Sequence, residues 1–196
     1  MLTYIFVHYN IVERLEMSPL YEIAFALWFI LPAYIANAFP VIFGGGLPID
    51  AGRKFLDGKP VFGSHKTVRG FVAGLVAGVL VSAAQTFVLQ FWAESDFARL
   101  LPFQFNLLIG SMIALGALIG DLVHSFVKRR IGLVEGAPLP LADQLDFVVG
   151  AILFSALVSG SLPPLLTVFL IFVITLPLHL LTNFIAYLLG VKKAPY

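Results

Sequence analysis

The stretch LLTVFLIFVITLPLHLLTNFIAYLL, residues 165–189, contains no charged side chain and is long enough to cross a lipid bilayer as one helix. Crossing about 30 Å of hydrocarbon takes about 20 apolar residues, because every backbone polar group must be bonded inside the helix. The whole chain has the same character: of its 196 residues 60% are hydrophobic and 12% are charged, and the mean hydropathy is +0.97. These values predict an all-α integral membrane protein.

Four further apolar runs precede this stretch, so we expect five transmembrane helices within a single membrane domain. The first twelve residues are apolar but too short to cross, and we expect them to lie at the membrane interface. Charged residues gather in two loops, 43–70 and 127–144, on one side of the predicted bundle. The predicted spans cover residues 20–42, 71–92, 102–126, 145–161 and 165–189.

Glycines recur at a spacing of four residues in two of these spans. They are Gly70, Gly74 and Gly78 in one span, and Gly116 and Gly120 in another. This spacing puts small residues on one helix face and allows neighbouring helices to approach closely in a membrane. It predicts tight helix packing, within a monomer or across a homodimer.

Positive charge predicts the orientation of the spans, because short loops rich in Lys and Arg stay in the cytoplasm. Five Lys and Arg residues lie in 48–70, three in 128–130 and two in 192–193, which makes ten of the twelve. The other side has only Arg14 and Arg99. We therefore expect a multi-pass protein of the cell membrane with its N-terminus outside and its C-terminus inside. The net charge of +1 gives no indication of a nucleic-acid partner.

The first charged loop reads PIDAGRKFLDGKPVFGSHKTVRG, residues 48–70. Glycine permits close backbone approach to a ligand, and a Gly-rich run that ends at a helix start offers backbone N–H groups to phosphate. Lys66 and Arg69 would add charge-assisted bonds. The alternative is that the basic residues only anchor the loop to anionic lipid, but such an anchor needs neither Asp50 nor Asp57. The spacing does not match a P-loop ATPase.

The second charged stretch joins GDLVHSFVKRR, residues 120–130, to PLADQLD, residues 140–146. On a helix, the spacing from Asp121 through Ser125 to Lys128 or Arg129 places acid, hydroxyl and base on one face. An ionisable group inside a membrane helix is expensive, so it is a functional candidate.

Asp143 and Asp146 are three residues apart and share a helix face. Each acid also has a structural alternative: Asp143 caps its helix, Asp146 complements the helix dipole, and Asp121 pairs with a Lys or Arg that reaches toward the interface. All three being structural at once is less favoured than a shared site. Three carboxylates near a basic loop suit Mg²⁺ bound to a polyphosphate, so we predict a magnesium site at these residues.

The two motifs together resemble the membrane CTP-dependent cytidylyltransferases, which make CDP-activated lipids and whose signature joins Ser-x-x-Lys-Arg to a later Asp-x-x-Asp. The 48–70 loop, with PAYIANAFP before it at residues 32–40, resembles the archaeal branch of that family, the CDP-archaeol synthases. The resemblance covers essentially the whole chain. The segment IGLVEGAPLP, residues 131–140, lacks the Lys-Asp pair and the His-Gly-Gly of the longer phosphatidate enzymes, and this favours the archaeal branch.

The resemblance implies transfer of CMP from CTP to an isoprenoid glycerol phosphate lipid, 2,3-bis-O-geranylgeranylglyceryl phosphate, at a site formed by the cytoplasmic loops. Its products would be CDP-archaeol and pyrophosphate. Catalysis would rest on Mg²⁺ at the three aspartates and on Lys128 and Arg129. These two residues would hold the lipid phosphate or the pyrophosphate, and the resemblance does not assign one ligand to each residue. Asp50 and Asp57 would bind cytidine or order the loop, while His124 and His179 are interpreted as structural. The full set expected to bind CTP and phosphate is Asn37, Asp50, Gly52, Asp57, Gly63, His65, Lys66, Thr67, Arg69 and Ser125.

Two other functions compete with this interpretation. A small ion-coupled transporter would bind its ion at Asp121, but it predicts polar residues deep in several spans and an internal repeat, and the sequence has neither. A non-catalytic lipid-binding or scaffold protein would need only the basic loops, and it leaves the three carboxylates without a purpose. We therefore favour a Mg²⁺-dependent enzyme.

Overall fold

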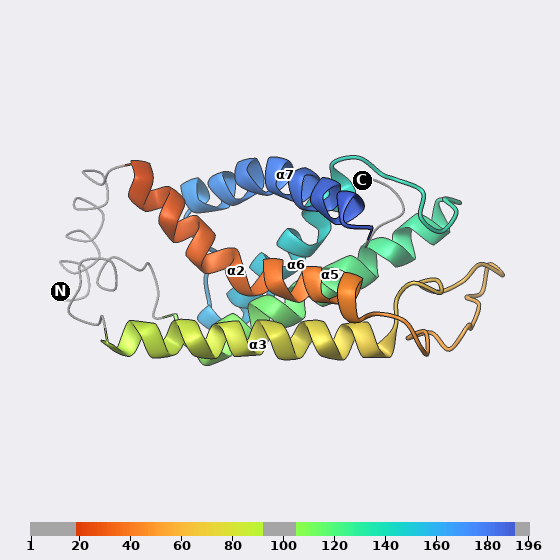
Figure 1. The fold of residues 1–196 in the computed structure, drawn as a ribbon, viewed down its shortest axis with the longest axis horizontal. Coiled ribbons are helices and arrows are strands. Elements are labelled where there is room, and N and C mark those ends of the chain that lie inside the picture. The colour runs from red at the N-terminus through yellow and green to blue at the C-terminus, as the bar shows by residue number, and fades with distance from the viewer. Residues whose placement is uncertain (1–18, 92–104, 191–196) are drawn as a thin grey trace.

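The computed structural model describes residues 19–91 and 105–190, and its secondary structure is helical. No strand is present in these two ranges; the loop before α3 contains two isolated β-bridges, Pro48 with Thr67 and Lys54 with Pro60. Five helices are each long and apolar enough to cross a membrane, which confirms the predicted all-α fold. They are α2 (Pro19–Phe43), α3 (Val68–Phe91), α5 (Leu107–Arg130), α6 (Ala142–Ser159) and α7 (Leu165–Leu188), drawn in Figure 1.

Local capping explains where two of the helices begin. Helix α3 starts before the predicted span because the Thr67 hydroxyl accepts a hydrogen bond from the backbone N–H of Gly70 at 3.2 Å. Helix α6 also starts early, where the side-chain oxygen of Gln144 accepts a hydrogen bond from the N–H of Leu141 at 2.6 Å. It ends at Gly160, whose φ of +75° is the left-handed conformation that commonly terminates helices.

The helices run so that five of their ends meet on one side of the molecule. Figure 1 shows the ends of α2, α5 and α7 and the starts of α3 and α6 on that side, together with the loops 44–67 and 131–141. All Lys and Arg residues of the described part lie there, within 53–69 and 128–130. We call this side the charged end. Several charges used above to predict orientation, among them Arg14, Arg99 and 192–193, lie outside the described residues, as does the apolar stretch 1–12.

Glycine contacts hold the central helices close together. A Cβ atom added to Gly120 of α5 would lie 2.5 Å from the carbonyl oxygen of Asp146 in α6, and one on Gly74 of α3 would lie 2.5 Å from the carbonyl oxygen of Ala36 in α2. Such contacts exclude any larger residue unless the backbone moves. The predicted close packing is therefore present within one chain, and it fixes the position of Asp146 relative to α5.

Helix α7 lies along one side of this group and packs on α2 and α6. The hydroxyl groups of Tyr34 and Thr175 are 2.8 Å apart, and the rings of Phe147 and His179 have centroids 6.0 Å apart. The ring contact fits the structural role expected for His179. Buried aromatic and aliphatic residues from α2, α5, α6 and α7 form the main core beneath the charged end.

Candidate active site

The first feature of the charged end is an ion pair between the first loop and α5. Backbone bonds from Ile49 N–H to the Lys66 carbonyl (2.8 Å) and from Val68 N–H to the Leu47 carbonyl (3.0 Å) fold the end of the loop back on its start. The Nζ of Lys66 then lies 2.7 Å and 2.6 Å from the two carboxylate oxygens of Asp121. Two residues predicted for different duties, phosphate binding and metal binding, are thus direct partners.

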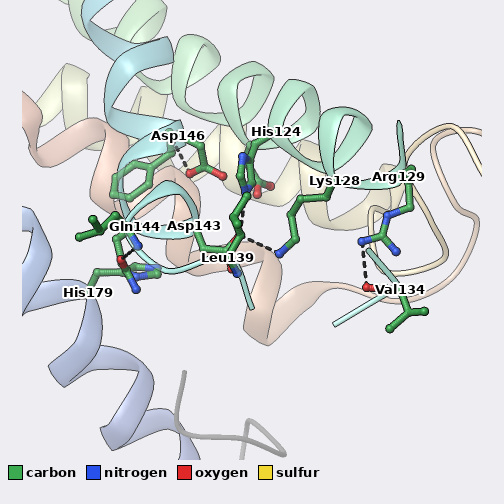
Figure 2. Close-up of polar contacts among 12 residues, drawn as sticks. His124, Lys128, Arg129, Val134, Leu139, Asp143, Gln144, Asp146 and His179 are labelled. Carbon is green, nitrogen blue, oxygen red and sulfur yellow. Dashed lines mark hydrogen bonds and ion pairs between the residues drawn. The ribbon is translucent and has the colours of Figure 1, made fainter. Parts of the chain in front are cut away.

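The second feature joins α5 to α6 through Asp143 (Figure 2). Its Oδ1 lies 2.7 Å from Nζ of Lys128 and 2.7 Å from Nε2 of His124, and its Oδ2 accepts a hydrogen bond from the N–H of Leu139 at 2.7 Å. His124 and Lys128 are one helical turn apart on α5, so both reach the same carboxylate. His124 was predicted to be structural, and its spacing of one turn from Lys128 is the sequence signal that places it beside Asp143.

Asp146 lies one turn further along α6 and is half-buried. It accepts a hydrogen bond at 2.5 Å from the N–H of the residue that follows it, and it interacts electrostatically with Asp121, Asp143 and Lys66. Its carboxylate is therefore close to both ion pairs. As the side chains are arranged, no three acidic or histidine residues in 19–91 and 105–190 are close enough to hold a metal ion.

Lys128 and Arg129 point in different directions, as Figure 2 shows. Lys128 turns toward Asp143, whereas Nη2 of Arg129 donates a hydrogen bond to the carbonyl of Val134 at 3.0 Å. Arg129 is 6% exposed, and its Nε has no hydrogen-bond partner in the described part of the chain. It lines a cavity of roughly 310 Å³ between the two loops, whose other lining residues are Lys59, Pro60, Gly132, Leu133, Val134 and Glu135.

Asp50 organises the first loop from its centre. Its carboxylate accepts hydrogen bonds from the backbone N–H groups of Gly52 (2.9 Å), Phe62 (2.9 Å) and Gly63 (3.1 Å). Burial tends to raise the pKa of Asp50, but these backbone bonds outweigh it, and the pKa lies below its usual value. Of the two roles predicted for Asp50, these contacts are those of loop ordering.

Arg130 fastens the same loop to the end of α5, a role that the sequence analysis did not assign. Its Nε lies 3.1 Å from a carboxylate oxygen of Asp57, and its guanidinium lies over the rings of Phe55 (4.9 Å) and Phe126 (4.6 Å). Its backbone carbonyl also accepts a hydrogen bond from Nζ of Lys59 at 3.0 Å. Asp57 therefore supports the loop through Arg130.

Arg69 and Thr67 both make contacts that stabilise helix ends. The Nε of Arg69 donates to the carbonyl of Phe43 at 2.8 Å, and its Nη2 donates to the carbonyl of Gly44, so it satisfies carbonyls at the end of α2. Thr67 caps α3, as described above. Of the other predicted ligands, Asn37 is half-buried in α2 and Ser125 is buried in α5.

Glu135 and Ser64 make a direct contact between the two loops that was not predicted from the sequence. The Oε2 of Glu135 accepts hydrogen bonds from the hydroxyl (2.6 Å) and the backbone N–H (3.2 Å) of Ser64. His65, which was expected at phosphate, has its Nε2 3.9 Å from the same carboxylate and is largely exposed. The Ser64 hydroxyl bond is the main reason why the pKa of Glu135 lies below its usual value.

Comparison with known proteins identifies the family. The sequence model of the CarS-like family, described as CDP-archaeol synthase, matches residues 20–196. The CDP-archaeol synthase of Methanopyrus kandleri is 46% identical over 176 residues, which cover 89% of this chain and 94% of the relative. That of Methanocaldococcus jannaschii is 41% identical over 88% of this chain and 97% of the relative, and that of Pyrococcus furiosus is 40% identical over 92% and 100%.

A solved structure, described as an intramembrane enzyme for archaeal membrane lipid biosynthesis, has the same fold. It matches with a TM-score of 0.66 at 39% sequence identity, and the match covers 81% of this chain and 92% of that one. With the five long apolar helices, this match supports a multi-pass membrane protein. These comparisons give no support to the alternative of a small transporter. The chain belongs to the CDP-archaeol synthase family.

Proposed function

We propose that this chain is a cytidylyltransferase that transfers CMP from CTP to 2,3-bis-O-geranylgeranylglyceryl phosphate, giving CDP-archaeol and pyrophosphate. The observation that carries the proposal is the pairing at the charged end, where Lys66 meets Asp121 and Lys128 meets Asp143 at 2.6 to 2.7 Å. These groups come from the first loop, α5 and α6. A phosphate substrate and a nucleotide would therefore both find cations that are already positioned.

The chemistry requires positioning and charge neutralisation. An oxygen of the lipid phosphate attacks the α-phosphorus of CTP, a new P–O bond forms, and the bond to the β-phosphate oxygen breaks to release pyrophosphate. Transfer of this kind depends mainly on aligning the reacting groups and stabilising charge on phosphorus. We assign the triphosphate to Lys66, and the lipid phosphate to Lys128, which lies on the α6 side.

We assign Mg²⁺ to Asp121, Asp143 and Asp146. Carboxylate oxygens are hard ligands that magnesium accepts, and Asp146 interacts unfavourably with both Asp121 and Asp143, a repulsion that a divalent cation would relieve. Because the three carboxylates do not converge as arranged, they would have to move closer together to share one ion. When bound, the ion would neutralise charge on the phosphates. Lys66 and Lys128 now hold two of the three carboxylates, so a metal would compete with these lysines for them.

We place the charged end in the cytoplasm, with the N-terminus outside. The Lys and Arg residues of 53–69 and 128–130 support this orientation through the preference of basic loops for the cytoplasmic side. Nucleotide would then reach the site from water, and the lipid acceptor would reach it from the bilayer.

The test is transfer of label from α-³²P-CTP into extractable lipid by purified protein with Mg²⁺. Geranylgeranylated glycerol phosphate and phosphatidate are compared as acceptors, and we expect product with the isoprenoid acceptor alone. Equal use of phosphatidate would overturn the substrate assignment, and no labelled lipid with either acceptor from folded protein would overturn the enzyme.

Matched variants locate the chemistry in the same assay. Asp143→Asn should lose transfer while the protein still folds. Glu22→Gln changes another carboxylate, which is buried near the start of α2 and away from the charged end, and this variant should keep transfer. Normal transfer by Asp143→Asn would remove this residue from the site.

A further inference from the structure

One contact between the two loops has no role in the proposed chemistry. Glu135, in the loop before α6, binds the hydroxyl and the N–H of Ser64 in the loop before α3, 71 residues away in sequence. The Glu135 side chain is 32% exposed. A Cβ added to Gly63 would lie 2.9 Å from its Oε1, so the glycine at this position lets the carboxylate approach the loop backbone.

The surroundings of this carboxylate are those of an anion site. A backbone N–H and a hydroxyl donate to it, and it also interacts electrostatically with His65 and Arg129. Arg129 is buried, and its Nε is unpartnered in the part of the chain described. Arg129, Lys59 and Glu135 also border the open hollow of roughly 310 Å³ between the two loops, although its surface is mainly apolar. The same donors would suit phosphate oxygens equally well.

We propose that Glu135 is an internal anion: it closes the loop 44–67 on the loop 131–141, and a polyphosphate displaces it from the hydroxyl and N–H of Ser64. The step is an exchange of hydrogen-bond acceptors at Ser64 and needs no covalent chemistry. A polyphosphate has more charge than one carboxylate, so it interacts more strongly with Arg129 and Lys59. That the displacing ligand is CTP rests on the proposed function, which places the same triphosphate at Lys66, two residues after Ser64.

The contact is also weak enough to be displaced. Because the Glu135 side chain is partly exposed, solvent screens its interaction with His65 and Arg129, and two hydrogen bonds remain as the main link. The contact therefore reduces affinity for the incoming anion without preventing binding. Removing it should make binding tighter, whereas removing a residue that binds the ligand would make binding weaker.

The test is calorimetric binding of inorganic tripolyphosphate and of CTP to the full chain. Glu135→Ala removes both the contact and the charge, and we expect the dissociation constant to fall by about fivefold, the loss of one modest competing interaction. Glu135→Asp keeps the charge but is one methylene too short to reach Ser64, so it should also bind more tightly. Tightening by alanine alone would attribute the effect to long-range charge and overturn the displacement. Unchanged or weaker binding by both variants would also overturn it.

Loop separation supplies a second readout. The chain has no cysteine, so single cysteines at Leu56 and Val134, both strongly exposed, can be spin-labelled specifically. In protein that keeps Glu135, we expect tripolyphosphate to change the distance between these labels. In the Glu135→Ala variant, we expect the same change without ligand. Identical distance distributions in all states would refute the displacement.

The two proposals fail separately. Tighter tripolyphosphate binding by Glu135→Ala in a protein that makes no CDP-lipid would leave the internal anion intact and overturn the transferase. Normal CDP-lipid synthesis with no tightening of tripolyphosphate binding would do the reverse.

Discussion

Replacing Lys66 with methionine tests the link between the first loop and α5. The substitution keeps the length and most of the apolar surface of the side chain but removes the ammonium group, whose Nζ lies 2.6 Å and 2.7 Å from the Asp121 carboxylate. The two side chains are 28% and 25% exposed, so screening is partial and the bond is charge-assisted. We expect the change to reduce the free energy of unfolding by about 2 kcal/mol, since a half-buried carboxylate would lose its partner.

A double-mutant cycle separates stability from catalysis. Thermal unfolding in detergent should shift down by about 4 to 8 °C in Lys66→Met, at about 2 to 4 °C for each kcal/mol in a chain of this size. Adding Asp121→Asn removes the unpaired charge and should recover much of the lost stability, which gives a coupling of about 2 kcal/mol. Transfer activity should not recover, because both groups are assigned to substrate or metal. We expect kcat/KM for CTP to fall about 10- to 100-fold in Lys66→Met, the value of one charge-assisted bond.

Two results would refute this reasoning. A coupling below about 0.5 kcal/mol would show that the pair makes no energetic link between the loop and α5. A double variant that regains transfer together with stability would show that both residues act only in folding.

Four further predictions address other parts of the charged end. The pKa of Asp50 lies below its usual 3.8, so its support of the loop is present above that value and is lost as pH falls through the lower folded pKa. Pepsin cleavage of the loop should therefore accelerate as the pH falls below 3.8, and in Asp50→Asn it should already be fast above that pH. Gly120→Ala forces α5 away from the backbone of Asp146 and should lower the free energy of unfolding by about 1 to 3 kcal/mol, measured by thermal unfolding. Chelation with EDTA should abolish transfer and excess Mg²⁺ should restore it, whereas activity that survives exhaustive chelation would remove the metal. Trypsin should cut after Arg53 or Lys54 in inside-out vesicles and leave these sites intact in right-side-out cells, and the opposite pattern would reverse the orientation.

The fold could be predicted from the sequence because the length of an apolar run is a local property. Each predicted span overlaps one helix, and the bilayer leaves few alternatives to a helix for such a run. The first residues of the helices were harder to predict. Thr67 and Gln144 extend their helices through side-chain caps, and a hydropathy pattern does not record a cap.

The pairings in the site were less accessible than its residue types. A Lys or Arg partner was one alternative for Asp121, but Lys66 is 55 residues away, and helical spacing could not single it out as that partner. The partner of Glu135 is 71 residues away in a loop, where no periodicity constrains side-chain direction. His124 differs from these two, since its position one turn before Lys128 placed it on the face of α5 that meets Asp143.

The structure separates the contacts of Lys128 and Arg129, which were predicted from the sequence to share their roles. Consecutive residues on an α-helix point about 100° apart, because about 3.6 residues make a turn. Lys128 therefore faces α6 and binds Asp143, while Arg129 faces the second loop and lines the cavity beside Glu135. Loss of Lys128 should then impair transfer by weakening the binding of the lipid acceptor. Loss of Arg129 should instead weaken the binding of tripolyphosphate, and Glu135→Ala should no longer tighten that binding once Arg129 is absent.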